Sequence, residues 1–321
     1  RSMNPVVSKI MKRLARTSVV HPGVVQPGRR GVAKAVIAAF AAIVMSVASA
    51  EPARAEPAAS DWIEGHNVRT RLIAGQQAAA NLAGSAAQDG SNILAGLELV
   101  MSSGWKTYWR QPGDAGGVPP EFDWSDSTNL ASATLLYPAP HRMTDRAGSA
   151  IGYKDGVIFP VLVVPQDQGK PVGLKLKLAF GVCRDICVPS EGAYEVTVPA
   201  SARPEVPEAL RQAIERVPKI ASAASASPLL VKSQTSLDGA ATKLTMHVNF
   251  PRGTAGADVF VEGPPGEFVP LPTQTDKVDD KTLIFEIDLS KGADVVALKG
   301  KQLKATMVSD AANSEQTFVL E

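Results

Sequence analysis

Strict alternation of apolar and polar residues is the feature that most constrains how this chain folds. Residues Leu174–Phe180 read LKLKLAF, so that every second side chain from Leu174 onward is a leucine or phenylalanine. Successive side chains of a β-strand point to opposite faces of the sheet. The pattern therefore predicts a strand with one face on a hydrophobic core and the other in water, as in an antiparallel sheet.

Other short runs of β-type sequence occur between residues 60 and 200, separated by turn residues. Glycine (26) and proline (24) are abundant among the 321 residues, which favours many turns and short strands over long helices. This spacing predicts an antiparallel sandwich. Its expected strands are His66–Ala74, Ile93–Met101, Val157–Val164, Gly173–Phe180 and Ala193–Val198.

A helix and a linker follow at residues 201–227. Glu208–Val217 places Leu210, Ile214 and Val217 at helical spacing, and the run SAASAS after it is typical of a linker. A second β domain is expected at residues 228–321, and it contains no cysteine. Its strands are predicted at Leu229–Ser233, Lys243–Phe250, Asp258–Glu262, Thr282–Leu289, Gln302–Val308 and Gln316–Leu320. The fold class is therefore all-β, with two sandwiches joined by a short helix and linker.

Residues 1–55 read as a signal peptide for export to the periplasm. A segment rich in lysine and arginine precedes an apolar stretch at residues 35–47, which is shorter than the roughly 20 residues that span a bilayer. Small-residue triplets then predict cleavage near residues 50–55. A retained N-terminal anchor is the alternative, and Arg29-Arg30 leaves a twin-arginine route open. Disulfides persist in such an oxidising compartment.

The charge balance of the remaining residues argues against nucleic-acid binding. Of the 33 basic and 32 acidic residues, nine basic and one acidic lie in residues 1–55, which leaves a net charge of −7 for the rest. No basic patch is evident there, as a phosphate backbone would require. We find no phosphate-binding loop, Ser-His-Asp arrangement or paired-carboxylate signature, and no small-molecule substrate is evident.

Cys183 and Cys187 are the two cysteines of the chain. They follow the alternating strand at once, and if the chain reverses there they flank a three-residue loop. Opposed hairpin positions lie within the Cα separation that a disulfide needs. A ring this small is compatible with a bond that opens and closes, and a structural staple is the alternative. Arg184 would stabilise a thiolate at this pair, whereas the neighbouring Asp185 would oppose it.

A third use of the cysteines is metal binding. Two thiolates four residues apart suit Cu(I), which prefers soft ligands. The supporting ligand would be His141, Met143 or His247. Zinc fits less well, because two cysteines and scattered histidines do not match the spacing of structural zinc sites. The redox interpretation itself requires no cofactor and no metal.

Motifs around the cysteines resemble a known family over about residues 60–200. They are similar to the N-terminal periplasmic domain of DsbD-type protein-disulfide reductases, in particular the branch that includes ScsB. Three residues separate the cysteines here, as in that branch, against five in the best-studied members. The matching segments are Gly104–Arg110 (GWKTYWR), Pro112–Gly116, Pro119-Pro120, Asp123–Ser125, Tyr137-Pro138, Pro140, Arg142, Gly152-Tyr153, Phe159–Val161 and Cys183–Pro189.

The resemblance implies an immunoglobulin-like fold, which we expect of both sandwiches. It also implies a thiol–disulfide oxidoreductase of the protein-disulfide reductase type. In that family a membrane domain reduces the cysteine pair, which then reduces a periplasmic protein of the thioredoxin fold. Carried to this chain, Cys183 and Cys187 are the redox pair, and Cys187 is the one expected to engage partners. The printed chain carries neither the membrane domain nor the terminal C-x-x-C domain, so it is a fragment or a stand-alone carrier with a separate electron donor.

Three aromatic residues are candidates for shielding the sulfurs or contacting a partner: Tyr108, Trp109 and Tyr153. The alternative is ordinary packing in the sandwich core, which buried aromatic residues commonly provide. A protein with a structural disulfide and a plain binding role also remains open.

Overall fold

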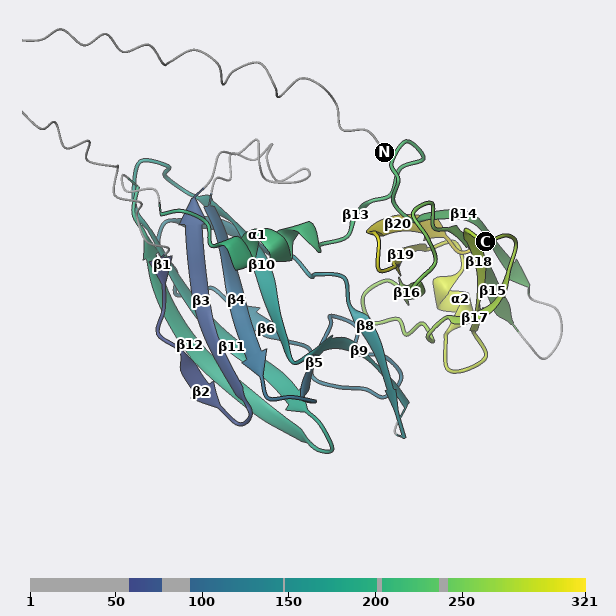
Figure 1. Cartoon of the computed structure of the whole chain (residues 1–321), viewed down its shortest axis with the longest axis horizontal. Coiled ribbons are helices and arrows are strands. Elements are labelled where there is room, and N and C mark those ends of the chain that lie inside the picture. The colour runs from purple at the N-terminus through teal and green to yellow at the C-terminus, as the bar shows by residue number, and fades with distance from the viewer. Residues whose placement is uncertain (1–57, 77–92, 147, 201–203, 237–241) are drawn as a thin grey trace, which may run out of the picture. The chain divides into compact units, whose positions relative to one another are not determined.

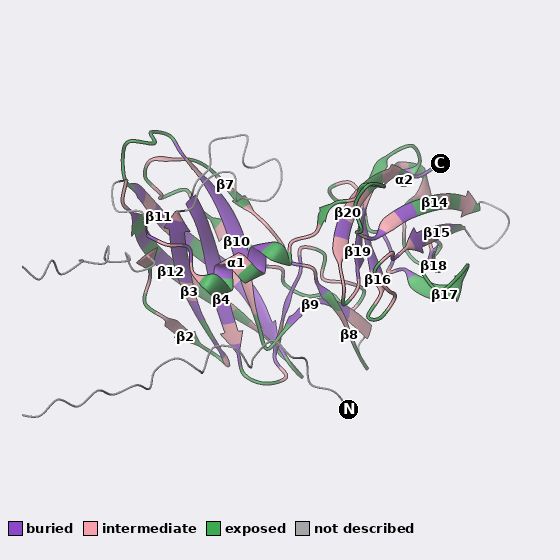
Figure 2. Ribbon diagram, turned by 45° about the horizontal axis from the view of Figure 1, so that its top comes forward, coloured by how far each residue is buried: buried purple, intermediate pink, exposed green. Residues whose placement is uncertain are grey.

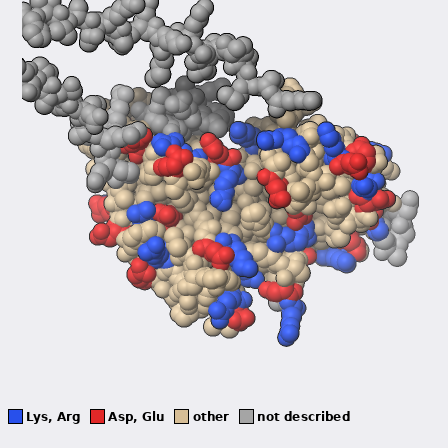
Figure 3. Space-filling view, in the orientation of Figure 1, with Lys and Arg blue, Asp and Glu red and all other residues tan. Residues whose placement is uncertain are grey.

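The computed structural model describes residues 58–76, 93–146, 148–200, 204–236 and 242–321 (Figure 1). The predicted signal peptide lies outside these residues. Within the described part of the chain, no helix is both long and apolar enough to cross a membrane. Lysine and arginine are interspersed with aspartate and glutamate over the face seen in Figure 3.

Two six-stranded sheets make up the first sandwich, and their strand pairs are antiparallel. One sheet has the order β1-β3-β4-β10-β7, with β2 paired to β3. Its strands are β1 (Ala58–Ala59), β2 (Ile63–Gly65), β3 (Val68–Gln76), β4 (Ile93–Met101), β7 (Leu130–Leu135) and β10 (Gly156–Pro165). The other sheet has the order β12-β11-β5-β9-β8, with β6 paired to β11. Its strands are β5 (Lys106–Tyr108), β6 (Glu121–Asp123), β8 (His141–Asp145), β9 (Gly148–Lys154), β11 (Val172–Cys183) and β12 (Cys187–Val198).

The alternation in β11 is explained by its two faces. Leu174, Leu176, Leu178 and Phe180 are at most 3% exposed and belong to the core between the two sheets. The lysines between them reach solvent, and Lys177 forms an ion pair with Asp126. Burying four large apolar side chains contributes about 1.5–3 kcal/mol each relative to exposure, so the register of β11 is strongly specified.

A short helix covers the outer face of the opposite sheet. In α1 (Glu208–Glu215), Leu210 and Ile214 pack against Leu94 of β4 and Leu162 of β10. Both faces of β4 are therefore largely buried, and in its sequence ILAGLELVM the one charged residue is Glu98, which pairs with Arg71 (Figure 2). Gly96 allows this close approach, because a Cβ there would lie 2.6 Å from a methyl carbon of Leu210.

The second sandwich consists of two four-stranded sheets. The first has the order β13-β20-β19-β16 and the second β14-β15-β18-β17; β13 is parallel to β20. A short helix, α2 (Val295–Leu298), precedes β19. The strands are β13 (Lys219–Ile220), β14 (Leu229–Ser236), β15 (Lys243–Asn249), β16 (Asp258–Glu262), β17 (Thr273–Lys277), β18 (Thr282–Asp288), β19 (Gln302–Val308) and β20 (Asn313–Val319). Alternate residues of β15 and β18, such as Met246 and Phe285, fill the core.

The all-β class and the pair of immunoglobulin-like sandwiches are confirmed. The strongly patterned strands β4, β16 and β19 lie at the predicted residues, and β11 extends three residues further, to Cys183. Several strands are not predicted by the sequence, among them β5 and β8, which are short, and β9, whose residues GSAIGYK do not alternate. These three strands lie side by side with β11 in one sheet and carry most of the residues around the cysteines.

Candidate functional site

The two cysteines face each other at the end of a hairpin, as predicted. β11 ends at Cys183, β12 begins at Cys187, and their Cα atoms are directly opposed at 4.1 Å. The loop between them is closed by a hydrogen bond from the Arg184 amide to the Ile186 carbonyl, 3.2 Å. The two sulfurs form a disulfide.

The two halves of this disulfide differ sharply in their access to solvent. Cys183 is 1% exposed, because it lies between β5 and β12 within the sheet. Cys187 is exposed, and so is Ile186 beside it, at 68%. A second protein can therefore approach the disulfide from the side of Cys187, whereas Cys183 lies inside the sheet.

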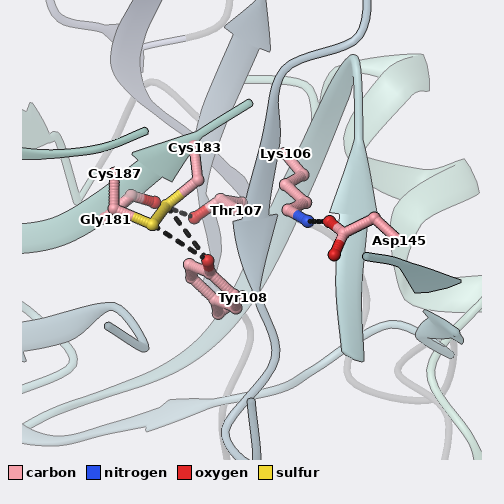
Figure 4. The surroundings of a disulfide bond; sticks show 7 residues. All are labelled: Lys106, Thr107, Tyr108, Asp145, Gly181, Cys183 and Cys187. Carbon is pink, nitrogen blue, oxygen red and sulfur yellow. Dashed lines mark hydrogen bonds and ion pairs between the residues drawn. A yellow bond between two sulfur atoms is a disulfide. The ribbon is translucent and has the colours of Figure 1, made fainter. Parts of the chain in front are cut away.

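Tyr108 lies against both sulfurs (Figure 4). Its hydroxyl donates a hydrogen bond to Cys183 Sγ at 3.0 Å and lies 3.3 Å from Cys187 Sγ. Burial raises the pKa of this phenol, the charge of Lys106 lowers it in part, and Asp145 raises it again. The hydroxyl thus keeps its proton at neutral pH and remains a donor to sulfur.

A glycine-rich loop holds the Tyr108 ring in place. Gly117 adopts a φ of +153° directly over the ring, and a Cβ at this position would overlap the ring atoms. The loop is tied to β11 by a hydrogen bond from the Gly181 amide to the Val118 carbonyl, 3.1 Å. The ring therefore has little freedom to turn away from the disulfide.

Tyr108, the last residue of β5, is the one of the three aromatic candidates that contacts the sulfurs. Trp109 follows β5 directly and belongs to the hydrophobic core. Trp109 packs instead against Phe260, with ring centroids 5.8 Å apart, and is 1% exposed. Arg110, the next residue, forms two hydrogen bonds with Glu262 of β16, at 2.8 and 2.6 Å.

Tyr153 also lies in the core rather than at the disulfide. It is directly opposite Thr107 in the β5–β9 pair and therefore shares the inward face. Its hydroxyl donates to the Pro138 carbonyl at 2.8 Å, and its ring meets Phe159 edge-on at 5.3 Å. Trp109 and Tyr153 therefore pack in the sandwich core and do not contact the sulfurs. Tyr108 is both buried and in contact with the sulfurs.

The structure places further residues around the cysteines, among them Met143, named above as a possible copper ligand. Met143 and Ala150, from β8 and β9, pack in one cluster with Tyr108 and Cys183. Lys106 is the Cα partner of Cys183 across the sheet. The spacing of Lys106 and Tyr108, two apart, would have indicated a shared face if β5 had been predicted as a strand.

Of the possible copper ligands, only Met143 lies in this cluster. His141 begins β8 and is exposed, and His247 lies on β15 in the second sandwich. Among the residues that the structure describes, no group of three or more histidine, cysteine, aspartate and glutamate side chains could hold a metal ion.

Comparisons with known proteins agree with this arrangement. Residues 69–199 match the family model of the N-terminal domain of the thiol:disulfide interchange protein DsbD. Residues 216–321 match a second family model, a domain of unknown function (DUF8393). No curated protein matches the chain.

Among solved structures, the chain is similar to the N-terminal periplasmic domain of ScsB from Proteus mirabilis. The sequence identity is 19% and the TM-score 0.61, over 83% of this chain and 99% of that one. Such coverage extends well beyond residues 69–199, so the similarity of fold includes the second sandwich. The first sandwich, which carries the disulfide, belongs to the family of DsbD N-terminal domains.

Proposed function

We propose that this protein is a periplasmic carrier that passes electrons through Cys183 and Cys187. The electrons would come from a membrane reductase and go to a partner of the thioredoxin fold. The observation that carries the proposal is the asymmetry of the disulfide, since Cys187 is exposed while Cys183 is 1% exposed and accepts a hydrogen bond from Tyr108. The family of the first sandwich and the periplasmic ScsB domain of similar fold support the reaction type and the compartment.

The exchange begins when a donor thiolate attacks the sulfur of Cys187, the exposed residue of the pair. A mixed disulfide forms, the bond between the two cysteines breaks, and its electron pair leaves on the sulfur of Cys183 as a thiolate. A second donor thiol then attacks the donor's own sulfur in the mixed disulfide and releases Cys187. The donor dithiol loses two electrons and becomes a disulfide, and the cysteine pair gains them.

The second half of the cycle runs the same chemistry in reverse. The thiolate of Cys187 attacks the disulfide of the acceptor, and Cys183 then attacks Cys187 to release the reduced acceptor. In both halves the charge on Cys183 appears or disappears beneath the hydroxyl of Tyr108. Hydrogen bonds to a charged group are stronger than those to a neutral one, so Tyr108 stabilises the thiolate more than the disulfide.

A trapping experiment with single-cysteine variants of the full chain tests this proposal. The probe is a thioredoxin whose resolving cysteine is replaced by serine and whose remaining thiol is activated with thionitrobenzoate. We expect Cys183→Ser, which keeps the exposed thiol, to form the mixed disulfide rapidly. Cys187→Ser, which keeps the buried thiol, is the matched control and should react at least tenfold more slowly. Equal rates would refute the asymmetry between the two cysteines, and the absence of a covalent complex with either variant would refute the proposal and favour a structural disulfide.

Met143 favours a second candidate function, the binding of Cu(I) by the reduced cysteines. Its side chain packs in the cluster of Cys183 and Tyr108, where a thioether could complete a soft three-sulfur ligand set. Anaerobic titration with Cu(I) separates this function from electron transfer. A copper site predicts that Met143→Leu weakens copper binding and leaves trapping by thioredoxin unchanged. Similar copper affinity in Met143→Leu and wild type would argue against the thioether ligand.

A further inference from the structure

A mostly buried lysine lies beside the disulfide. Lys106 is directly opposite Cys183 in the β5–β11 pair, and the Cβ atoms of opposed residues are typically about 4.5–5.5 Å apart. Its side chain is 13% exposed. It stands two residues before Tyr108 on the same strand, so the ammonium and the phenol share the face of the sheet that carries the sulfurs.

The ammonium of Lys106 has a carboxylate partner while the disulfide is closed. Lys106 Nζ lies 2.9 Å from Asp145 Oδ2, and the Asp145 side chain is 46% exposed (Figure 4). Asp145 ends β8, the edge strand that also brings Met143 to the cluster. The lysine stem is flexible, so its ammonium can move between this carboxylate and a new negative charge nearby.

The other charged groups around the hairpin are placed less favourably. Arg184, adjacent to Cys183 in sequence, is 55% exposed, pairs with Asp185 at 3.0 Å and lies over the Trp105 ring at 5.7 Å. Lys154 is the exposed partner of Lys106 on β9, and Asp155 accepts a hydrogen bond from the Gly104 amide. Lys106 is the cation with the least exposed side chain in this set, and its charge is therefore screened least by water.

We propose that Lys106 stabilises the thiolate that leaves on Cys183, and that Asp145 holds the ammonium while the disulfide is closed. This inference rests on the proposed function. When the donor attacks Cys187 and the electron pair moves to Cys183, the ammonium gains a second anionic partner. A more stable leaving thiolate departs faster and makes the disulfide easier to reduce. Lys106 is thus a positioning and electrostatic residue for the exchange.

The test is the rate constant for reduction of the disulfide in the full chain by two small thiols. Dithiothreitol attacks as an anion, whereas the ammonium of cysteamine balances its thiolate. We expect Lys106→Met to slow both reactions by a similar factor, roughly tenfold. The interaction of a partly buried charge with a thiolate is stronger than that of an exposed ion pair and weaker than that of a fully buried one. The equilibrium with dithiothreitol should shift by at most that factor, or about 30 mV.

Three further variants make the result specific. Lys106→Arg keeps the charge and should stay within about threefold of wild type. Asp145→Asn should accelerate reduction, because it frees the ammonium and removes a repelling charge. Lys175→Met, on β11 eight residues before Cys183 and in an ion pair with Glu195, is the matched control and should be unchanged.

Several outcomes would overturn the inference. The first is a rate constant for Lys106→Met that is no lower than that of Lys175→Met. The second is slowing of Lys106→Met with dithiothreitol but not with cysteamine, which would show that Lys106 only attracts the attacking anion. The third is an equal slowing by Asp145→Asn. If the inference fails while Cys183→Ser still traps thioredoxin, the proposed function stands. If Lys106→Met slows reduction but no variant traps thioredoxin, the charge effect is real and the proposed function fails.

Discussion

Replacement of Tyr108 by phenylalanine isolates the contribution of one hydroxyl to the chemistry of the disulfide. The hydroxyl lies 3.0 Å from Cys183 Sγ and 3.3 Å from Cys187 Sγ. A hydrogen bond to a charged group contributes about 1.5–3 kcal/mol, and one to a neutral group about 0.5–1.5 kcal/mol. The thiolate therefore loses about 1–2 kcal/mol more than the disulfide does when the hydroxyl is removed.

This difference predicts a rate of reduction by dithiothreitol roughly 5- to 30-fold lower in Tyr108→Phe, since each 1.4 kcal/mol is a factor of ten. The reduction potential should become more negative by at most about 20–45 mV. The ring remains under Gly117, so the stability of the folded, oxidised protein should change by less than about 1 kcal/mol.

The assay follows the fraction of alkylated cysteines over time in excess dithiothreitol, and then in buffers of defined dithiothreitol ratio. Tyr153→Phe is the matched control, because it removes a buried hydroxyl that donates to the Pro138 carbonyl. It should lose about 1 kcal/mol of stability and keep the wild-type rate. If both variants are reduced at the same rate as wild type, the hydrogen bond to sulfur has no part in the exchange.

Three further predictions test the surroundings of the site. Gly117→Ala should slow reduction of the disulfide by pushing Tyr108 aside. Gly116 also has a positive φ but has open space around it. Gly116→Ala should therefore cost about 1 kcal/mol of stability and keep the wild-type rate of reduction. Arg110→Met should lower the free energy of unfolding by about 2–4 kcal/mol, because the carboxylate of Glu262 is 10% exposed and loses its closest partner. Adding Glu262→Gln should restore part of the lost stability, and denaturant titration measures both effects. Burial raises the pKa of all four tyrosines above the usual value of 10.0. Near and above pH 10 the folded protein therefore holds more protons than the unfolded one, so its free energy of unfolding should be complete below pH 10 and fall as the pH rises beyond it. A urea midpoint that stays constant across that range would contradict this prediction.

Much of the fold follows from local sequence patterns. Strands β4, β16 and β19 lie where their local pattern predicts them, because a strand long enough to cross a sandwich must bury at least one complete face. The hairpin at Cys183 and Cys187 was also predictable, since a strong alternating strand ends there and the pair needs only a local reversal. The hairpin depends on pairing between residues close in the chain, whereas β4 and β16 pair with strands distant in the sequence and are recognised only from their own local pattern.

The surroundings of the disulfide were only partly predictable. Sequence reasoning selected Tyr108 together with Trp109 and Tyr153, but a strand of three residues, Lys106–Tyr108, has too little pattern to show which of its side chains share a face. The face is decided by pairing with β9 and β11, whose residues lie more than 40 positions further along. Lys106 and Asp145 were not selected at all, because only those pairings bring them together.

What the sequence determined by itself is therefore the all-β architecture and the presence of a cysteine pair at the tip of a hairpin. The tertiary structure alone decided that Cys183 is buried and Cys187 exposed, that a phenol donates to the sulfur of Cys183, and that Lys106 is the partner of Cys183 across the sheet. The physical reason is that alternation and turn propensity act over a few residues. Burial and cross-strand pairing depend instead on how segments distant in the chain assemble around a common core.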